Sequence, residues 1–179
     1  MDKLPEPLLD TKRLVLEPLE EAHAPLLFDG FQDPTLYTYI PGGPPADVEG
    51  LAARYRHLAQ GRSDDDTSVW LNWAMRPRDT ATYIGTLQAT LDADGKALIA
   101  YMVFKSFRRR GYAKEGCHRM IQFLRGERQV KTIAAEIDTR NGPSIALVRS
   151  LGMQVVAEHK DADFFKGSGS DEYEFVLVM

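Results

Sequence analysis

The chain has 179 residues, of which 44% are hydrophobic, 27% charged and 9% aromatic. This length is typical of a single domain, here residues 1–179, and the composition excludes the disordered, fibrous and membrane-spanning classes. Because 26 Asp and Glu outnumber 22 Lys and Arg, the formal net charge is -4, and we expect no nucleic-acid partner and no membrane partner.

The first half of the chain predicts a strand, two helices and then three more strands. Residues 11–18 hold a short apolar run that ends at Pro18, which is typical of a strand. Residues 20–28 and 46–60 predict helices, the second because its apolar residues recur at helical spacing. Three apolar runs separated by turn residues then predict an antiparallel meander at 69–75, 83–90 and 97–104.

The second half predicts two helices and three strands. Residues 113–125 form an amphipathic pattern directly after a glycine, and residues 132–138 alternate as a strand does. A further helix is expected to begin near Pro143 and to end at Gly152. Short strands are predicted at 155–158 and 173–178, joined by a polar loop at 160–170. This order of elements predicts an α+β fold.

The segment at residues 107–114, Phe-Arg-Arg-Arg-Gly-Tyr-Ala-Lys, lies between a predicted strand and a predicted helix. The first turn of a helix has unpaired backbone N–H groups and a partial positive charge, so it binds anions. Gly111 and Ala113 let the backbone approach such a ligand closely, and the three arginines add charge-assisted hydrogen bonds. The segment therefore predicts a phosphate or pyrophosphate site.

Three other interpretations of this basic segment are possible. It could be a solvated turn ahead of a surface helix. A kinase or NTPase would also need a phosphate loop, but the chain lacks Gly-x-x-x-x-Gly-Lys-Ser/Thr and a carboxylate evidently placed for magnesium. A nucleic-acid module conflicts with the negative net charge.

Residues 108–115, Arg-Arg-Arg-Gly-Tyr-Ala-Lys-Glu, resemble the Q/R-x-x-G-x-G/A signature of the GNAT acyltransferases. The similarity is greatest to the branch that includes the ribosomal-protein N-terminal acetyltransferases. Other parts of that branch's pattern have counterparts in Thr-Lys-Arg-Leu-Val-Leu at 11–16, Tyr-Ile-Gly at 83–85, Asn-Gly-Pro-Ser at 141–144 and Leu-Gly-Met at 151–153. The resemblance therefore covers most of the chain.

The resemblance implies acetyl-CoA as acyl donor, no metal, and a mostly antiparallel sheet of about seven strands flanked by about four helices. In the family, a bulge splays the strand at 101–104 from the strand at 132–138, and the pantetheine arm of the cofactor lies in the gap. The residues that the resemblance assigns to the cofactor are Met102, Val103, Phe104, Arg108, Arg109, Arg110, Gly111, Tyr112, Ala113, Lys114 and Asn141.

Direct acyl transfer needs an uncharged amine, a hydrogen-bond donor for the thioester oxygen, and a proton for the departing thiolate. Many family members carry a general-acid tyrosine where this chain has Val148, so Ser144 is the preferred proton donor. Glu136, which we favour, and Asp138 lie on one face of a strand beside the expected gap, and either could accept the amine proton. Ser144 could instead be an ordinary residue in the first turn of the helix, and Glu136 and Asp138 could each belong to an exposed ion pair.

The acceptor is expected to be an amine, either a peptide N-terminus or a small molecule. Tyr37 and Tyr39 belong to the segment that lines the acceptor side in this family, so both are candidates for substrate binding. A non-catalytic acyl-CoA sensor with the same fold is the alternative function. The single cysteine, Cys117, cannot form an intrachain disulfide and no signal peptide is evident, so we expect a cytoplasmic protein; relatives are often homodimers.

Overall fold

Eight strands form one mixed sheet in the computed structural model of the chain, which describes residues 6–178. The strands are β1 (Leu9–Asp10), β2 (Leu14–Pro18), β3 (Val69–Pro77), β4 (Gly85–Leu91), β5 (Lys96–Val103), β6 (Thr132–Asp138), β7 (Gln154–Phe165) and β8 (Ser168–Val178). Their order across the sheet is β1-β2-β3-β4-β5-β6-β8-β7, and only the β5–β6 pair is parallel within the described residues. The expected mostly antiparallel sheet is confirmed, with one more strand than predicted.

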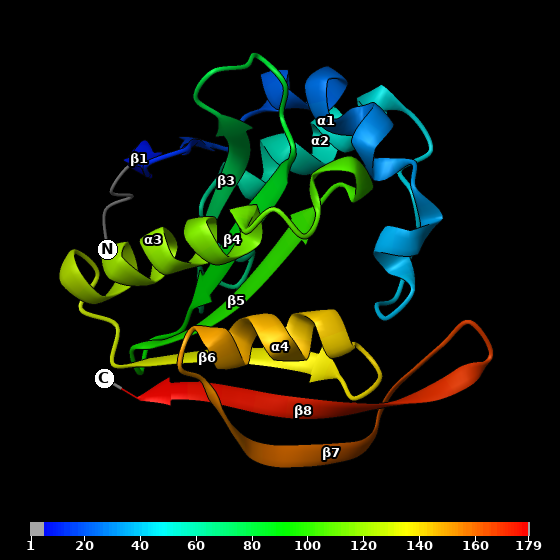
Figure 1. The fold of residues 1–179 in the computed structure, drawn as a ribbon, viewed down its shortest axis with the longest axis vertical. Coiled ribbons are helices and arrows are strands. Elements are labelled where there is room, and N and C mark those ends of the chain that lie inside the picture. The colour runs from blue at the N-terminus through cyan, green and yellow to red at the C-terminus, as the bar shows by residue number, and fades with distance from the viewer. Residues whose placement is uncertain (1–5, 179) are drawn as a thin grey trace.

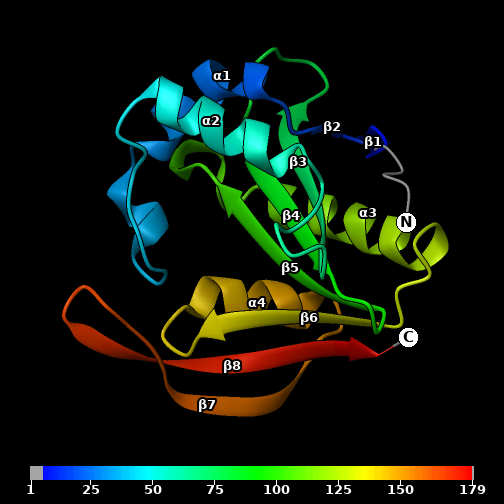
Figure 2. The same cartoon turned by 180° about the vertical axis from the view of Figure 1, so that it is seen from behind.

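Helices cover both faces of this sheet (Figures 1 and 2). The α-helices are α1 (Ala24–Phe31), α2 (Val48–Leu58), α3 (Tyr112–Gly126) and α4 (Gly142–Ser150), and the short 3-10 helices are η1 (Glu21–His23), η2 (Pro34–Tyr37) and η3 (Lys105–Phe107). Asp47 caps α2 by accepting a 2.7 Å hydrogen bond from the Gly50 N–H, while α1 and α4 carry proline in their first turns. No helix within residues 6–178 has the length and apolar character to cross a membrane.

Each face of the sheet has its own apolar core. Trp73 and Met75 on β3 are fully buried in the core beneath α3 and α4. Ala74, between them, is buried in the second core beneath α1 and α2. The alternation follows from the strand repeat, which sends successive side chains to opposite faces.

The sheet divides where β5 and β6 separate. These strands pair only from Lys96↔Thr132 to Leu98↔Ala134, although β5 continues to Val103 and β6 to Asp138. Beyond this corner β6 pairs with β8 alone, so a wedge opens toward the carboxyl ends of β5 and β6 (Figure 1). The expected splay is confirmed. The bulge expected to cause it is not present between β4 and β5, whose register is unbroken from Gly85↔Val103 to Leu91↔Ala97. The splay follows instead from the divergence of β6.

The C-terminal hairpin differs from the prediction. We expected a polar loop at 160–170, but β7 and β8 run through most of that range and meet at a two-residue turn, Lys166-Gly167. Both turn residues have positive φ, 52° and 79°, as a type I′ turn requires. The prediction was wrong because the polar composition of the segment is typical of an exposed edge hairpin as well as of a loop. The separate short strand β1 was also not predicted.

Candidate active site

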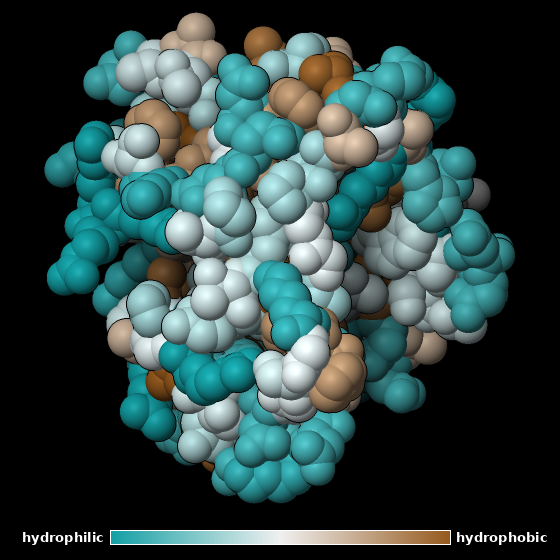
Figure 3. Space-filling model, turned by 90° about the vertical axis from the view of Figure 1, so that its right-hand side faces the viewer, coloured by the Kyte–Doolittle hydropathy of each residue, from teal (hydrophilic) through white to brown (hydrophobic). Residues whose placement is uncertain are grey.

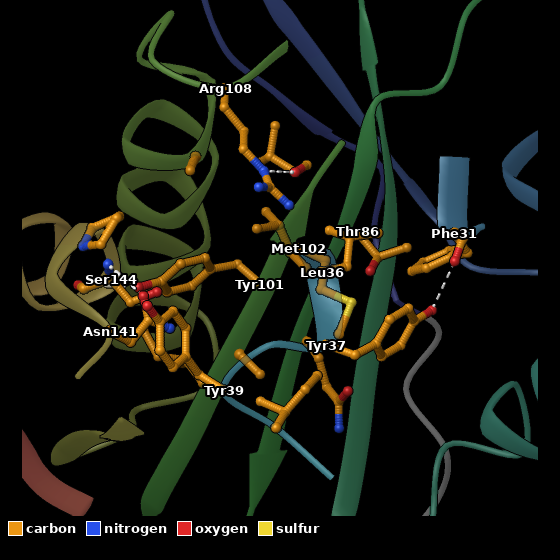
Figure 4. A pocket seen from close by; sticks show the side chains of 18 of the residues that line it. Phe31, Leu36, Tyr37, Tyr39, Thr86, Tyr101, Met102, Arg108, Asn141 and Ser144 are labelled. Carbon is orange, nitrogen blue, oxygen red and sulfur yellow. Dashed lines mark hydrogen bonds between the residues drawn. The ribbon is translucent and has the colours of Figure 1, made fainter. Parts of the chain in front are cut away.

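A cavity of about 1290 Å³ occupies the wedge between β5 and β6 and continues beneath α2. Its walls come from the end of α1 and the segment that follows it, from α2, from β3 to β6, from the residues that begin α3 and α4, and from β8. Figure 3 views the molecule from the side that holds the tip of the β7–β8 hairpin, at residues 166–167, and the α1–α2 segment, residues 32–47. Apolar surface is visible there in recesses between polar side chains. The side chains that point into the cavity from both sides are drawn in Figure 4.

The N-terminus of α3 forms one end of the cavity. Gly111 is its N-cap and has φ +81°, a conformation that favours glycine, and Arg109 also has a positive φ of 60°. This geometry turns the chain sharply before the helix. The predicted residues that line the cavity here are Arg108, Arg109, Gly111, Tyr112, Ala113 and Lys114.

Two predicted cofactor residues point elsewhere. Phe104 is buried and packs its ring edge-to-face on Phe31 at 5.1 Å between centroids; Phe31 lines the cavity, but Phe104 behind it does not. Arg110 lies with its guanidinium over the Phe107 ring at 5.6 Å and also does not line the cavity. The remaining predicted strand residues, Met102 and Val103, do line it.

A network that the sequence did not reveal fixes the loop before α3. The Glu115 carboxylate accepts hydrogen bonds from the Thr11 hydroxyl at 2.6 Å and from the Arg13 Nε at 2.6 Å. Arg13 Nη1 in turn donates to the Arg110 carbonyl at 2.9 Å. Burial raises the pKa of Glu115, but the hydrogen bonds from Thr11 and Arg13 outweigh it and hold the pKa below its usual value. The carboxylate therefore stays charged and, with Arg13, ties the turn between β1 and β2 to the loop.

Arg108 spans two sides of the cavity. Its Nε donates to the Val103 carbonyl at 2.9 Å, and its Nη1 lies 3.4 Å from the Thr35 hydroxyl on η2 (Figure 4). The side chain thus connects the end of β5 to the α1–α2 segment, in addition to bringing a positive charge to the cavity.

The backbone at the end of β5 is held close to Gly85. A Cβ atom at Gly85 would lie 2.0 Å from the Met102 carbonyl oxygen, so only glycine fits there. Phe104 N–H bonds to the Ile84 carbonyl on the β4 side at 2.9 Å. Since neighbouring N–H groups in an antiparallel ladder point to opposite edges, the Val103 N–H points toward the wedge.

Asn141, Ser144 and Tyr101 meet on the opposite side of the wedge (Figure 4). The Asn141 Oδ1 caps α4 by accepting from the Ser144 N–H at 3.3 Å, and the Tyr101 hydroxyl donates to the Ser144 carbonyl at 3.3 Å. Burial raises the pKa of Tyr101, so its hydroxyl stays protonated. Val148 is fully buried and does not line the cavity, whereas Tyr101, which sequence reasoning missed, brings a phenol to it.

Asp138 lines the cavity, but its carboxylate is already engaged. Arg140 donates to it from the backbone N–H at 2.8 Å, from Nε at 2.9 Å and from Nη2 at 2.5 Å, and the Ser170 hydroxyl donates at 2.8 Å. These bonds, led by those of Arg140, lower the pKa of Asp138 to about 2. Such a carboxylate is a poor proton acceptor, and its evident role is to join the end of β6 to β8.

Glu136 and Glu172 are the other carboxylates of the cavity. Glu136 is an exposed residue of β6, and Glu172 lies on β8 as the register partner of Asp138. Burial and the negative charge of Glu136 raise the pKa of Glu172. Glu172 was missed because nothing local distinguishes one glutamate of a strand from another; its place beside Glu136 depends on the pairing of β6 with β8.

The two predicted tyrosines line the cavity in different ways. Tyr37 is 8% exposed, and its hydroxyl donates to the Phe31 carbonyl at 3.1 Å, so its polar end is satisfied within the protein. Tyr39 is half-buried and points toward Asn141 (Figure 4). The hairpin tip also reaches this segment, because Lys166 Nζ donates to the Tyr37 carbonyl.

Comparison with known protein families gives a direct match. Residues 13–154 match the acetyltransferase (GNAT) domain family. The chain belongs to the GNAT acetyltransferase family. This acetyltransferase is also 27% identical over 173 residues to an uncharacterized N-acetyltransferase p20 of Bacillus licheniformis, with 95% of each chain covered.

Solved structures share the fold of this acetyltransferase. The ribosomal-protein-S5-alanine acetyltransferase of Vibrio fischeri is 14% identical, has a TM-score of 0.82 and is covered over 96% of each chain. The microcin C7 self-immunity acetyltransferase MccE, solved in complex with acetyl-CoA and AMP, is 15% identical, has a TM-score of 0.81 and is covered over 94% of each chain.

The cavity of this GNAT acetyltransferase has the chemistry that acetyl-CoA requires. A helix N-terminus with Arg109 and Lys114 suits the anionic pyrophosphate, and the wedge beside Val103 presents backbone groups to an amide-rich arm. The apolar wall of Ile99, Leu87 and Leu147 suits the hydrocarbon parts of that arm. The residues present therefore fit the cofactor that the family uses.

Proposed function

We propose that the chain is an N-acetyltransferase that moves an acetyl group from acetyl-CoA directly to a primary amine, without a covalent enzyme intermediate. The acceptor is a peptide N-terminus or a small-molecule amine. One observation carries the proposal: a single cavity joins a basic helix N-terminus to a group of carboxylates. We call the part lined by residues 107–114 the donor end, and the part lined by α2, the α1–α2 segment, β3 and the carboxylates the acceptor end.

Acetyl-CoA supplies a thioester, an activated acyl group whose sulfur leaves as a thiolate. At the donor end, the N–H groups of the first turn of α3, Arg109 and Lys114 would hold its pyrophosphate. The unpaired edge of β5 at Val103, the Met102 side chain and the Asn141 amide would hold the pantetheine arm. The Val103 N–H, directed into the wedge, is the proposed donor to the developing oxyanion.

Glu136 and Glu172 are the proposed acceptors of the amine proton. An acceptor amine is charged at neutral pH and becomes a nucleophile only when it loses a proton. A raised pKa makes the Glu172 carboxylate a better base than a fully solvated one, and the charge of Glu136 sustains that shift. Asp138 is left out of this role because its oxygens are bonded to Arg140 and Ser170.

The thiolate requires a proton or a hydrogen-bond donor, and two hydroxyls of the cavity can provide one. Ser144, in the first turn of α4, is the residue we favoured from sequence. Tyr101 is the second, since its hydroxyl reaches the same turn of α4 and stays protonated. Ser144→Ala and Tyr101→Phe test the two hydroxyls. We propose that the residue whose substitution causes the larger loss of turnover, with acetyl-CoA affinity unchanged, is the proton donor to the thiolate.

The experiment that tests the function is an assay of free thiol released from acetyl-CoA in the presence of a panel of primary amines. Amine-dependent thiol release, with the acetylated amine detected by mass spectrometry, is the expected result. A protein that binds acetyl-CoA but acetylates no amine in the panel would instead support the sensor function.

A further inference from the structure

The wall of the acceptor end holds two buried polar groups that have no partner. Tyr55 on α2 is 3% exposed and Asn72 on β3 is 4% exposed, and both line the cavity. Neither the Tyr55 hydroxyl nor the Asn72 Nδ2 has a hydrogen-bond partner among residues 6–178. Buried side-chain donors are nearly always bonded, so two such groups on one cavity wall need an explanation.

Strand register explains why Asn72 faces α2. Asn72 alternates with Trp73, whose side chain lies in the core beneath α3, so Asn72 points to the opposite face. It is opposite Gln88 on β4, and Gln88 is opposite Ala100 on β5. The three side chains form a row across the sheet, and all three line the cavity beneath Tyr55.

The surroundings of these groups define what they can bind. Leu19, Leu51 and Leu58 line the cavity and pack in one apolar cluster with Tyr55, and the Leu19 N–H bonds to the Asn72 carbonyl at 2.8 Å. A ligand group beside Tyr55 and Asn72 is therefore largely removed from water. Burial raises the pKa of Tyr55, so its hydroxyl stays protonated, and both polar groups can donate a hydrogen bond.

The charge distribution favours an uncharged ligand group. The nearest cation that lines the cavity from α2, Arg54, is an exposed residue, so no buried cation compensates an anion at Asn72. The same cavity is lined by the carboxylates of Glu136, Asp138 and Glu172, whose negative charges disfavour an anionic ligand group. A neutral carbonyl oxygen, as in an amide, meets both conditions.

We propose that Tyr55 and Asn72 form a subsite for an uncharged carbonyl group that the acceptor carries in addition to its amine. The proposal rests on the proposed acetyltransferase function, and it assigns the acceptor a shape: an amine that reaches the carboxylates and a carbonyl that reaches beneath α2. An alkylamine without a carbonyl leaves both hydrogen-bond donors unpaired, and an unpaired buried donor costs free energy.

The test compares kcat/KM for ω-amino amides of increasing chain length with alkylamines of matched length and with ω-amino acids. At least one amide is expected to exceed its matched alkylamine and its matched acid by about 10-fold, the effect of one or two buried hydrogen bonds. Tyr55→Phe and Asn72→Leu should each remove most of that preference while acetylation of the alkylamine and affinity for acetyl-CoA stay unchanged. Equal kcat/KM for amides and alkylamines, or a preference for the acids, would overturn the proposal.

A measurement without turnover separates this proposal from the proposed function. Because the Tyr55 hydroxyl has no partner, Tyr55→Phe should leave the melting temperature of the free protein unchanged or raise it, whereas Tyr37→Phe, which loses the bond to Phe31, should lower it. In the presence of CoA, the best amide should raise the melting temperature of wild type and not of Tyr55→Phe. If the amide raises the melting temperature of wild type alone but no amine is acetylated, the subsite proposal is supported and the acetyltransferase proposal is refuted. If amines are acetylated but the amide does not raise the melting temperature, the acetyltransferase proposal is supported and the subsite proposal is refuted.

Discussion

One stretch of chain, residues 107–114, builds the donor end of the cavity, whereas the acceptor end is assembled from α2, the α1–α2 segment, β3, β6 and β8, which are far apart in the sequence. The donor end uses mainly backbone groups at the start of α3, and the acceptor end uses side chains. A binding site made of backbone N–H groups tolerates substitution of most neighbouring side chains, while a site made of side chains depends on the identity of each residue. The two ends should therefore respond differently to substitution.

The two ends also differ in charge. Arg108, Arg109 and Lys114 line the donor end, and Glu136, Asp138 and Glu172 line the acceptor end. A polyanionic donor and a cationic amine are therefore directed to opposite ends of one cavity. The following changes test this division, beginning with the one of largest expected effect.

Gly111→Asp should abolish binding of acetyl-CoA, with a loss of roughly 1000-fold or more, because it places a negative charge and a side chain at a helix N-terminus that requires φ near +81°. Calorimetric titration measures the loss. Gly126→Asp is the matched control, since it adds the same charge at the other end of α3, where a Cβ meets nothing within 4 Å, and should leave binding intact. Equal losses in both variants would refute a donor site at Gly111.

Glu172→Gln should lower kcat by about 100-fold, the lower range for loss of a general base, with little effect on acetyl-CoA affinity. The effect of its neighbour Glu136 is measured by the pH dependence of kcat/KM. Removing the charge of Glu136 lowers the pKa of Glu172, so Glu136→Gln should move the acidic limb of kcat/KM to lower pH and should lose less activity than Glu172→Gln. An unmoved limb in Glu136→Gln would show that the two carboxylates are not coupled.

Asp138→Asn should act on stability more than on chemistry. The pKa of Asp138 is about 2 in the folded protein against 3.8 as its ordinary value, so its ion pair stabilises the fold above about pH 4 and loses that effect as the pH falls toward 2. Urea unfolding at pH 6 should show a loss of roughly 2 kcal/mol in the variant, shrinking at pH 3. Ser170→Ala, which retains the larger effect of Arg140 on the pKa of Asp138, should keep most of the wild-type pH dependence. A pH-independent loss in Asp138→Asn would contradict the ionised role.

Lys166→Met should have the smallest effect. It removes the bond from the hairpin tip to the Tyr37 carbonyl, which holds one side of the acceptor end, so KM for the amine should rise roughly two- to fivefold, as for a loss of about 0.5–1 kcal/mol. Steady-state kinetics with the amine varied measures it. Lys160→Met is the matched control, because Lys160 pairs with Glu158 and Asp171 on the hairpin, and it should leave KM unchanged.

The elements around the donor end follow from local sequence. The amphipathic repeat of α3, the glycine before it and the proline that starts α4 are each recognisable within a few residues. The meander of β3, β4 and β5 was equally predictable, because short turns leave few alternatives to antiparallel pairing.

The acceptor end could not be predicted in the same way. Glu172, Tyr101 and Asn72 lie on strands whose sequence shows two alternating faces but not which face meets the cavity. The hairpin of β7 and β8 was hidden because its exposed edge strand carries polar residues, and only the Lys166-Gly167 turn signals it. The role of Asp138 depended on Arg140, whose side chain folds back over two residues.

The central claim is that residues 107–114 and the wedge between β5 and β6 bind acetyl-CoA. Calorimetric titration of the wild-type protein with acetyl-CoA, with ATP as the control and free CoA as competitor, tests it most directly. We expect micromolar binding of acetyl-CoA, displaced by CoA and not matched by ATP. Absence of acetyl-CoA binding, or equal affinity for ATP, would contradict it.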